Sequence, residues 1–260
     1  MTIKDFTIEA YKIYLSALKK NYKNNLRFDE YMLLENKPQS FFLVRHDVDR
    51  KIVNSLRMAE IEYRMGIKSS YYFRMRSNTF KPDIIKKIQK MGHEVGYHYE
   101  CLSDFDGDMN RALDEFKKNL LEFRKHVTIK TISMHGSPLG AFDNRDMWRV
   151  KENYKILLEE LDLLGELYLE IDYSDIHYIT DTGRNWKSEK DNHRDKVDSK
   201  LDINYESGLE LLLSLKGKKH NKIVFQIHPE RWSFSNTEYY TQAFIDKISN
   251  FGKSIIGEIR

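Results

Sequence analysis

The feature that most constrains this chain is an alternation of short apolar segments with longer amphipathic ones, recurring roughly every 30 residues, the length of one β/α unit. The apolar segments predict strands at Phe41–His46, Ser70–Arg74, His93–His98, Thr128–Met134, Leu167–Ile171, His177–Thr180 and Lys222–His228. The amphipathic segments predict helices at Asp49–Met65, Pro82–Met91, Asp108–Lys125, Tyr154–Leu164, Tyr205–Leu215 and Thr237–Phe251. This alternation is typical of an α/β protein with a parallel sheet. Six or more such units favour a closed or nearly closed barrel over an open sheet.

The chain of 260 residues is expected to form one barrel domain over residues 1–260, with a helical N-terminal extension over residues 1–36. In that extension, apolar residues recur at helical spacing, and examples are Phe6, Ala10 and Ile13. No internal repeat or linker divides the chain.

The composition excludes several classes of protein. Lysine and arginine alternate with acidic residues, and the net charge is only +3, so no basic stripe suited to nucleic acid is expected. No stretch approaches the ~20 apolar residues of a membrane span. The one cysteine, Cys101, excludes an internal disulfide. Because charged residues occupy the N-terminus where a signal peptide would be apolar, we expect a cytoplasmic protein.

The first predicted strand ends in charged side chains. Residues two apart on a strand share a face, so Arg45, Asp47 and Asp49 should point one way and His46 the other. Carboxylates at the end of an apolar strand are costly unless they are paired, protonated or bound to a cation. Two interpretations follow. Either Asp49 caps the next helix and Asp47 pairs with Arg45, or the carboxylates bind a metal.

Three other predicted strands end in histidine: His98, His135 and His228. A single histidine in such a position is more often structural than catalytic, and His93, at the beginning of its strand, is interpreted that way. In a parallel barrel, however, the carboxyl ends of the strands converge on one mouth. Asp47, Asp49 and the three histidines would then surround one cavity, and such Asp/His clusters are typical of zinc or iron sites.

These motifs resemble those of the NodB-homology, or polysaccharide deacetylase, superfamily (carbohydrate esterase family 4, CE4, and its relatives). The most specific pieces are Gly92–His98 (GHEVGYH) and Ile227–Pro229, and the match extends from Phe41 to Pro229. The set is similar to a divergent branch associated with surface-polysaccharide biosynthesis. The resemblance implies a distorted, TIM-like (β/α)7 barrel, in agreement with the alternation.

The resemblance also implies roles for individual residues. Asp47 takes the place of the catalytic base, Asp49 and His98 those of metal ligands, and His228 that of the acid that protonates the leaving amine. The expected cofactor is a divalent metal, zinc before iron, cobalt or nickel, which would activate water and polarise the amide. Arg45 would help to offset the charge of the oxyanion.

The sequence departs from the family pattern at three points. Leu102 stands where a second histidine is usual, the adjacent Asp-Asp pair is spread over Asp47 and Asp49 so that their roles are exchangeable, and an Arg-Pro motif is replaced by His135-Gly136-Ser137-Pro138. We predict that His135 supplies the third metal ligand, with Glu100 as its rival. The predicted substrate-binding residues are Arg45, Glu100, Asp181 and Trp186, although Trp186 is equally interpretable as core.

The predicted function is metal-dependent removal of the acetyl group from an N-acetylated sugar or sugar-containing precursor. A glycan-binding pseudoenzyme is one alternative, since the usual second histidine is absent. A metal-free glycoside hydrolase is another, and it would need a second carboxyl from Glu100, Asp175 or Asp181 roughly 5–10 Å away. The expected partner is a carbohydrate, not nucleic acid or membrane. The sequence predicts no oligomeric state, and it leaves the substrate open.

Overall fold

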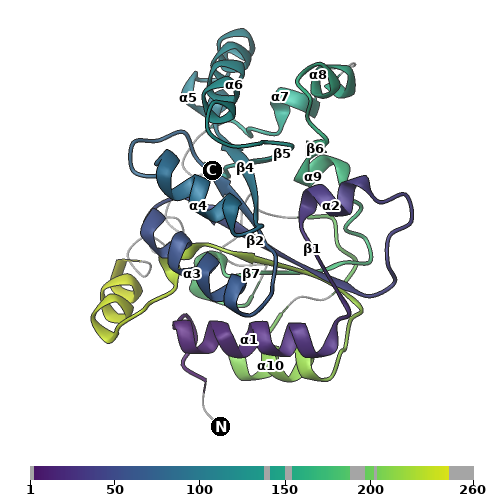
Figure 1. Cartoon of the computed structure of the whole chain (residues 1–260), viewed down its shortest axis with the longest axis vertical. Coiled ribbons are helices and arrows are strands. Elements are labelled where there is room, and N and C mark those ends of the chain that lie inside the picture. The colour runs from purple at the N-terminus through teal and green to yellow at the C-terminus, as the bar shows by residue number, and fades with distance from the viewer. Residues whose placement is uncertain (1–2, 138–140, 150–153, 188–196, 202–203, 246–260) are drawn as a thin grey trace.

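We describe a computed structural model of the chain, which covers residues 3–137, 141–149, 154–187, 197–201 and 204–245. At its centre is one curled parallel sheet with helices around it (Figure 1). The described strands are β1 (Asn24–Leu26), β2 (Phe41–Val48), β3 (Ser70–Phe73), β4 (Glu94–Tyr99), β5 (Thr131–Met134), β6 (Gly165–Glu166), β7 (His177–Thr180) and β8 (Lys222–Ile227). They run in the order β6-β5-β4-β3-β2-β8-β7, and β1 pairs with β2 beside this path.

The sheet curls into a half-barrel whose edge strands are β6 and β7, so the α/β barrel class predicted from the alternation is confirmed. The described helices are α1 (Ile8–Asn21), α2 (Phe28–Leu33), α3 (Ile52–Arg64), α4 (Pro82–Lys90), α5 (Cys101–Asp104), α6 (Met109–Arg124), α7 (Asp146–Arg149), α8 (Tyr154–Glu160), α9 (Leu167–Glu170) and α10 (Gly208–Lys216), with 3-10 turns η1 (Thr182–Arg184) and η2 (Pro229–Arg231). Helices α1 and α10 pack side by side at the bottom of Figure 1.

Strand β2 forms the middle of the sheet, where it pairs with β3 on one side and β8 on the other. Every residue of Phe41–Val48 is buried, as expected for a parallel strand covered on both faces. The predicted alternation is confirmed: Arg45 pairs with Asp47 on the inner face, and His46 contacts Glu62 of α3 on the outer face. The strand therefore carries a separate polar system on each face.

The outer polar system is a closed cluster around Glu62, which is fully buried. Its carboxylate lies 2.6 Å from His46 Nε2 and accepts hydrogen bonds from the Tyr11 hydroxyl and, at 2.6 Å, from the Tyr71 hydroxyl. Although burial acts in the opposite direction, the two neighbouring histidines and Tyr11 lower the pKa of Glu62 to about 2. His93 lies 3.7 Å from Glu62, accepts a hydrogen bond from Ser69 N at Nδ1, and donates from Nε2 to the Ala59 carbonyl oxygen. These contacts confirm the structural role predicted for His93.

The inside of the half-barrel is filled near its centre by Tyr72 of β3. Its ring crosses β4 at Gly96, where a Cβ atom would lie 2.2 Å from Tyr72 Cε1. The Tyr72 hydroxyl reaches across to Thr131 Oγ1 of β5 at 2.7 Å. Gly96 is thus required for a close approach between two strands, which leaves the space beyond Tyr72, at the carboxyl ends, for polar side chains.

Some predicted elements differ from the structure. The strand predicted at Leu167–Ile171 is wrong: this segment is α9, whose first turn is capped by Glu166, because the Glu166 side chain accepts a hydrogen bond from Tyr168 N. The N-terminal extension is helical as predicted, but it also contains β1, which pairs in parallel with the start of β2. Of the predicted helix Thr237–Phe251, residues 237–245 are helical, and residues 246–251 lie outside the described residues.

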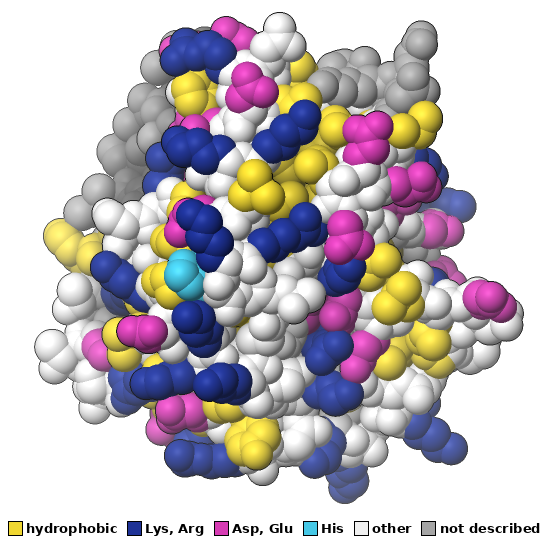
Figure 2. Space-filling model, turned by 45° about the horizontal axis from the view of Figure 1, so that its top comes forward, with side chains coloured by type: hydrophobic (Ala, Val, Ile, Leu, Met, Phe, Trp, Pro, Cys, Tyr) yellow, Lys and Arg dark blue, Asp and Glu magenta, His cyan; other side chains and the backbone are white. Residues whose placement is uncertain are grey.

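Acidic and basic side chains are spread together over the face drawn in Figure 2, as the interleaved sequence predicts. Within the described residues, no helix is both long and apolar enough to cross a bilayer.

Candidate functional site

The carboxyl ends of four strands bring the predicted chemical residues to one edge of the sheet. Asp47 belongs to β2 and Asp49 follows it, His98 belongs to β4, and His135 and His228 directly follow β5 and β8. Pairing of the strands in parallel aligns these ends, because β2 neighbours β8 and β4 neighbours β5. The structure therefore brings together side chains that are far apart in the sequence.

The imidazoles of His98 and His135 both approach one carboxylate oxygen of Asp49. Asp49 Oδ1 lies 3.5 Å from His98 Nε2 and 3.6 Å from His135 Nε2. These separations are long for hydrogen bonds, and Oδ1 is buried without a hydrogen-bond partner. Neighbouring ligand atoms around a four-coordinate zinc with bonds of about 2.0–2.1 Å lie about 3.3–3.4 Å apart. The two separations from Asp49 Oδ1 are therefore close to the distance between neighbouring corners of a zinc tetrahedron.

The other ring nitrogen of each imidazole is already engaged. His98 Nδ1 lies 3.0 Å from the Ser133 carbonyl oxygen, and His135 Nδ1 lies 3.1 Å from Glu100 Oε2. Because a carbonyl and a carboxylate only accept, each Nδ1 donates its proton. In the neutral ring, Nε2 then keeps a lone pair directed toward Asp49, which is how metal-binding histidines are commonly oriented.

This donor set fits a divalent transition metal: two imidazole nitrogens and one carboxylate oxygen, with a buried oxygen that lacks a partner. In the described part of the chain, no group of three or more such side chains is arranged to hold a metal ion as it stands. Small adjustments of side chains are therefore part of any metal binding here. Although burial favours the neutral acid, without a metal the positive charges that His135 and His98 carry when protonated outweigh the effect of burial and hold the pKa of Asp49 well below its ordinary value.

Asp47 lies beside this group but has partners of its own. Arg45 binds it in a two-pronged ion pair, at 2.8 Å from Nε to Oδ1 and 2.7 Å from Nη2 to Oδ2, and Gln226 Nε2 donates to Oδ2 at 2.7 Å. Burial raises the pKa of Asp47, but Arg45 and the nearby His98 outweigh it and lower the pKa below the ordinary value. The pairing of Asp47 with Arg45 is thus observed. The capping role considered for Asp49 is not, because Lys51 is the N-cap of α3.

His228 and Asp181 form a buried dyad where β8 and β7 end. His228 Nδ1 lies 2.6 Å from Asp181 Oδ1, while Asp181 Oδ2 accepts from His228 N at 3.0 Å and from Trp232 Nε1 at 2.7 Å. Burial and Arg231 favour the neutral ring, but the Asp181 carboxylate outweighs them and raises the pKa of His228 to about 9. The dyad therefore holds a protonated imidazole at neutral pH.

The remaining predicted substrate-binding residues have protein partners. Arg45 is fully buried, and its guanidinium also donates to Ser133 Oγ at 2.5 Å. Glu100 binds Arg74, Arg76 and His135. Trp186 is 4% exposed and stacks on Phe6 at 5.1 Å between ring centroids, so it lies in the core, one of the two interpretations left open above.

Sequence reasoning missed Glu230, which follows the His228-Pro229 pair in η2. Its side chain is buried, Oε2 has no hydrogen-bond partner, and Arg50 Nη2 is 3.9 Å from Oε1. Burial, and then the negative charge of Asp49, raise the pKa of Glu230 to about 7. An acidic residue two positions after a strand-ending histidine was the available signal. Gln226 and Ser133 were also missed, because polar residues inside apolar strands carry no motif.

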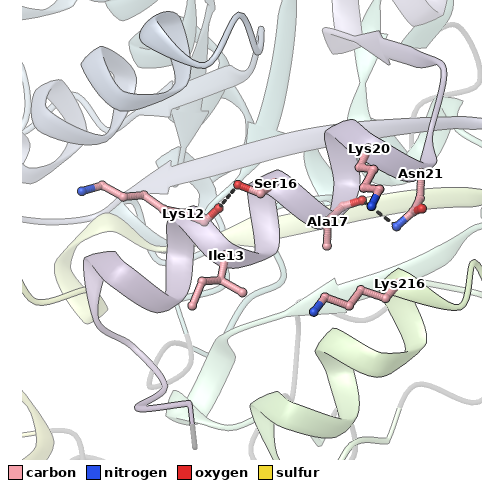
Figure 3. A pocket seen from close by; sticks show the side chains of 7 residues that line it. All are labelled: Lys12, Ile13, Ser16, Ala17, Lys20, Asn21 and Lys216. Carbon is pink, nitrogen blue, oxygen red and sulfur yellow. Dashed lines mark hydrogen bonds between the residues drawn. The ribbon is translucent and has the colours of Figure 1, made fainter. Parts of the chain in front are cut away.

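Two described cavities lie elsewhere on the molecule. A groove of about 490 Å³ lies between α1 and α10 and is lined by Lys12, Ile13, Ser16, Ala17, Lys20, Asn21 and Lys216 (Figure 3). A smaller pocket of about 300 Å³ is lined by residues that include Asp175, His220 and Lys222. Neither is lined by a residue predicted to be catalytic, metal-binding or substrate-binding in the deacetylase, although Asp175, considered for the glycoside hydrolase, lines the smaller one, so the candidate site is defined by the strand ends alone.

Comparison with known proteins adds the following. No protein-family model matches the chain, and no curated protein matches it. The solved structures to which it is similar are polysaccharide deacetylases of the NodB-like CE4 family, and include a pseudoenzyme of that family. A CE4 family pseudoenzyme from Bacillus anthracis is 15% identical, with a TM-score of 0.43, and the similarity covers 82% of this chain and 62% of that one.

Two further similar structures are the catalytic domain of a peptidoglycan N-acetylglucosamine deacetylase from Eubacterium rectale and a CE4 esterase from Streptococcus mutans. The first is 13% identical, covers 82% of this chain and 87% of the other, and has a TM-score of 0.45. The second is 12% identical, covers 87% and 85%, and has a TM-score of 0.44. This chain spans less than two thirds of the B. anthracis pseudoenzyme. At this level of similarity, the function must be argued from the residues of the site.

Proposed function

We propose, on the premise of a CE4-type fold, that this chain is a metal-dependent deacetylase that hydrolyses the acetamide of an N-acetylated sugar or sugar-containing precursor. The observation that carries the proposal is the buried Asp49 Oδ1, which has no hydrogen-bond partner and lies 3.5 and 3.6 Å from the Nε2 atoms of His98 and His135. The substrate class, and a place in surface-polysaccharide biosynthesis, rest on the resemblance of the motifs alone.

Asp49, His98 and His135 would hold the metal, with zinc as the expected ion and iron, cobalt or nickel as alternatives. A divalent metal bound here supplies Lewis-acid polarisation of the amide carbonyl and a more acidic water. The third ligand is assigned to His135 rather than Glu100, because the carboxylate of Glu100 lies behind the imidazole and is bound by Arg74 and Arg76.

Asp47 would accept the proton of the attacking water. Arg45 keeps this carboxylate ionised. Oδ1 accepts only from Arg45 Nε and retains capacity to accept, whereas Oδ2 already accepts from both Arg45 and Gln226. His228 would donate a proton from Nε2 to the departing nitrogen, because its Nδ1 is engaged by Asp181. Base and acid thus come from two neighbouring strands, β2 and β8.

The test is metal content by mass spectrometry on protein purified without chelators, combined with acetate release from a panel of N-acetylated sugars and nucleotide-linked sugars. We expect about one metal per chain, lost together with acetate release in Asp49→Ala. Asp175→Ala is the matched control, because Asp175 is an exposed acid paired with Lys222. Acetate release by Asp49→Ala at the wild-type rate would refute the proposal.

A second candidate is a glycan-binding protein without catalysis. It is favoured by Asp47, both of whose oxygens are bound by Arg45 in a buried ion pair. Sugar binding in calorimetry, without acetate release from any bound sugar by the metal-loaded protein, would support it over the deacetylase.

A metal-free glycoside hydrolase is less well supported. Its general acid needs a raised pKa. Burial acts to raise the pKa values of Glu100 and Asp181, but charged neighbours outweigh it. His135 and Arg74 lower the pKa of Glu100, and His228 and Arg231 lower the pKa of Asp181. The third carboxylate considered, Asp175, is exposed and paired with Lys222.

A further inference from the structure

Glu100 is the most heavily bound carboxylate near the site. Arg74 donates to it from Nε at 2.8 Å and from Nη2 at 2.6 Å, and Arg76 donates from Nε at 2.7 Å. The Arg74 and Glu100 side chains are 19% and 9% exposed, so solvent has little access to this ion pair. These bonds fix both carboxylate oxygens, and therefore the direction in which Glu100 can accept from a further donor.

That further donor is His135, whose Nδ1 lies 3.1 Å from Glu100 Oε2. This ion-pair contact favours a proton on Nδ1, on the side away from Asp49, and leaves Nε2 toward Asp49. His98 reaches the same arrangement differently, because a backbone carbonyl, that of Ser133, accepts from its Nδ1. The two imidazoles are thus oriented by acceptors of different charge, and only His135 depends on a side chain.

We propose that Glu100, held by Arg74 and Arg76, is a positioning residue that fixes the tautomer and the direction of the His135 imidazole toward the metal. The inference rests on the proposed function, since it needs His135 to be a ligand. A carboxylate behind a ligating histidine makes the imidazole more basic, and removing such a partner commonly weakens metal binding 10–100-fold. Glu100 then contacts neither substrate nor metal.

One rival acceptor is present. Ser137 Oγ lies 3.1 Å from His135 Nδ1, and a hydroxyl can accept as well as donate. If Ser137 orients the ring, Ser137→Ala should weaken metal binding and substitution of Glu100 should not. The two side chains can therefore be distinguished by substitution.

The experiment measures zinc affinity by competition with a chromophoric chelator, and the cobalt(II) absorption spectrum, on the full chain. We expect Glu100→Gln to bind zinc 10–100-fold more weakly, with a changed cobalt spectrum, and Ser137→Ala to bind as the wild type does. Asp104→Asn is the matched control, because the Asp104 side chain pairs with Arg76, and its hydrogen bond to Glu100 runs between backbone atoms that the substitution keeps. Should Glu100→Gln fail to fold, Arg76→Gln removes one bond to Glu100 from a 40% exposed side chain, and a several-fold loss is expected.

Wild-type zinc affinity and an unchanged cobalt spectrum in Glu100→Gln would overturn the inference while leaving the proposed function intact, provided that Asp49→Ala loses zinc. A loss in Ser137→Ala alone would overturn it in favour of Ser137. A wild-type chain that binds no zinc and no cobalt would overturn the proposed function, and this inference with it.

Discussion

The dyad of His228 and Asp181 allows a quantitative prediction about proton donation. In wild-type protein the pKa of His228 is raised from 6.5 to about 9, although burial and Arg231 act against it. That difference corresponds to about 3 kcal/mol in favour of the imidazolium. Asp181→Asn removes the charge responsible and leaves the opposing effects in place, so the pKa of His228 should fall to 6.5 or below.

The lower pKa of His228 should reduce the protonated fraction of this residue at neutral and alkaline pH. At pH 8 a group with a pKa of about 9 is about 90% protonated, whereas one with a pKa of 6.5 is about 3% protonated, a loss of roughly thirtyfold. If His228 is the acid, acetate release in the wild type should fall as pH rises through about 9. In Asp181→Asn the fall should come below neutral pH, and activity at pH 8 should drop at least thirtyfold.

The assay is a pH titration of the His228 Cε1–H signal by NMR, which needs no activity, accompanied by the pH profile of acetate release. Trp232→Phe is the control, because it removes another donor to Asp181 Oδ2 and leaves the charge. A His228 pKa that stays near 9 in Asp181→Asn would refute the reasoning. So would a wild-type pKa at or below 6.5.

Three further predictions concern stability. Arg45→Met leaves the buried carboxylate of Asp47 without its ion-pair partner and should lower the free energy of unfolding by about 3–5 kcal/mol in urea titrations; a loss below 1 kcal/mol would contradict this. Gly96→Ala should cost about 1–3 kcal/mol, because its Cβ would overlap the Tyr72 ring, and a thermal midpoint equal to that of the wild type would show that the ring moves freely. The lowered pKa of Glu62, about 2 against an ordinary 4.5, adds about 3 kcal/mol of stability above pH 4.5 that is lost as pH falls toward 2; Glu62→Gln should flatten this part of the stability profile, and an unchanged profile would exclude Glu62 as its source.

The sequence was most informative where the period-two alternation of a strand coincides with charged residues. It separated Arg45 and Asp47 from His46 correctly, because the two faces of a buried strand cannot be exchanged. It also indicated that the strand ends meet, since parallel strands leave them no other arrangement. The sequence left the choice of third metal ligand between His135 and Glu100 open. The orientation of Glu100 depends on Arg74 and Arg76, whose positions are set by the geometry of the loop after β3.

Other features of the structure could not be predicted from local sequence patterns. Leu167–Ile171 is apolar enough for a strand, but the Glu166 cap ends β6 after two residues and starts a helix. The core position of Trp186 depends on its contact with Phe6, which lies 180 residues earlier in the sequence. Glu230 belongs to a short turn whose burial depends on the segments packed around it, so its position two residues after His228 does not by itself predict that its side chain is buried.

Because β2 carries a different polar system on each face, the segment of the gene that encodes it should not tolerate a change in length. Deleting a single codon within Phe41–Val44 would turn every later side chain of the strand to the opposite face, so that His46 would point into the inner polar system and Asp47 would point toward Glu62. Both polar systems would be lost in one event, whereas a substitution affects one of them. In a library of random single-codon deletions and insertions, we therefore expect this strand to tolerate none, even at positions where an exchange of one apolar residue for another is accepted.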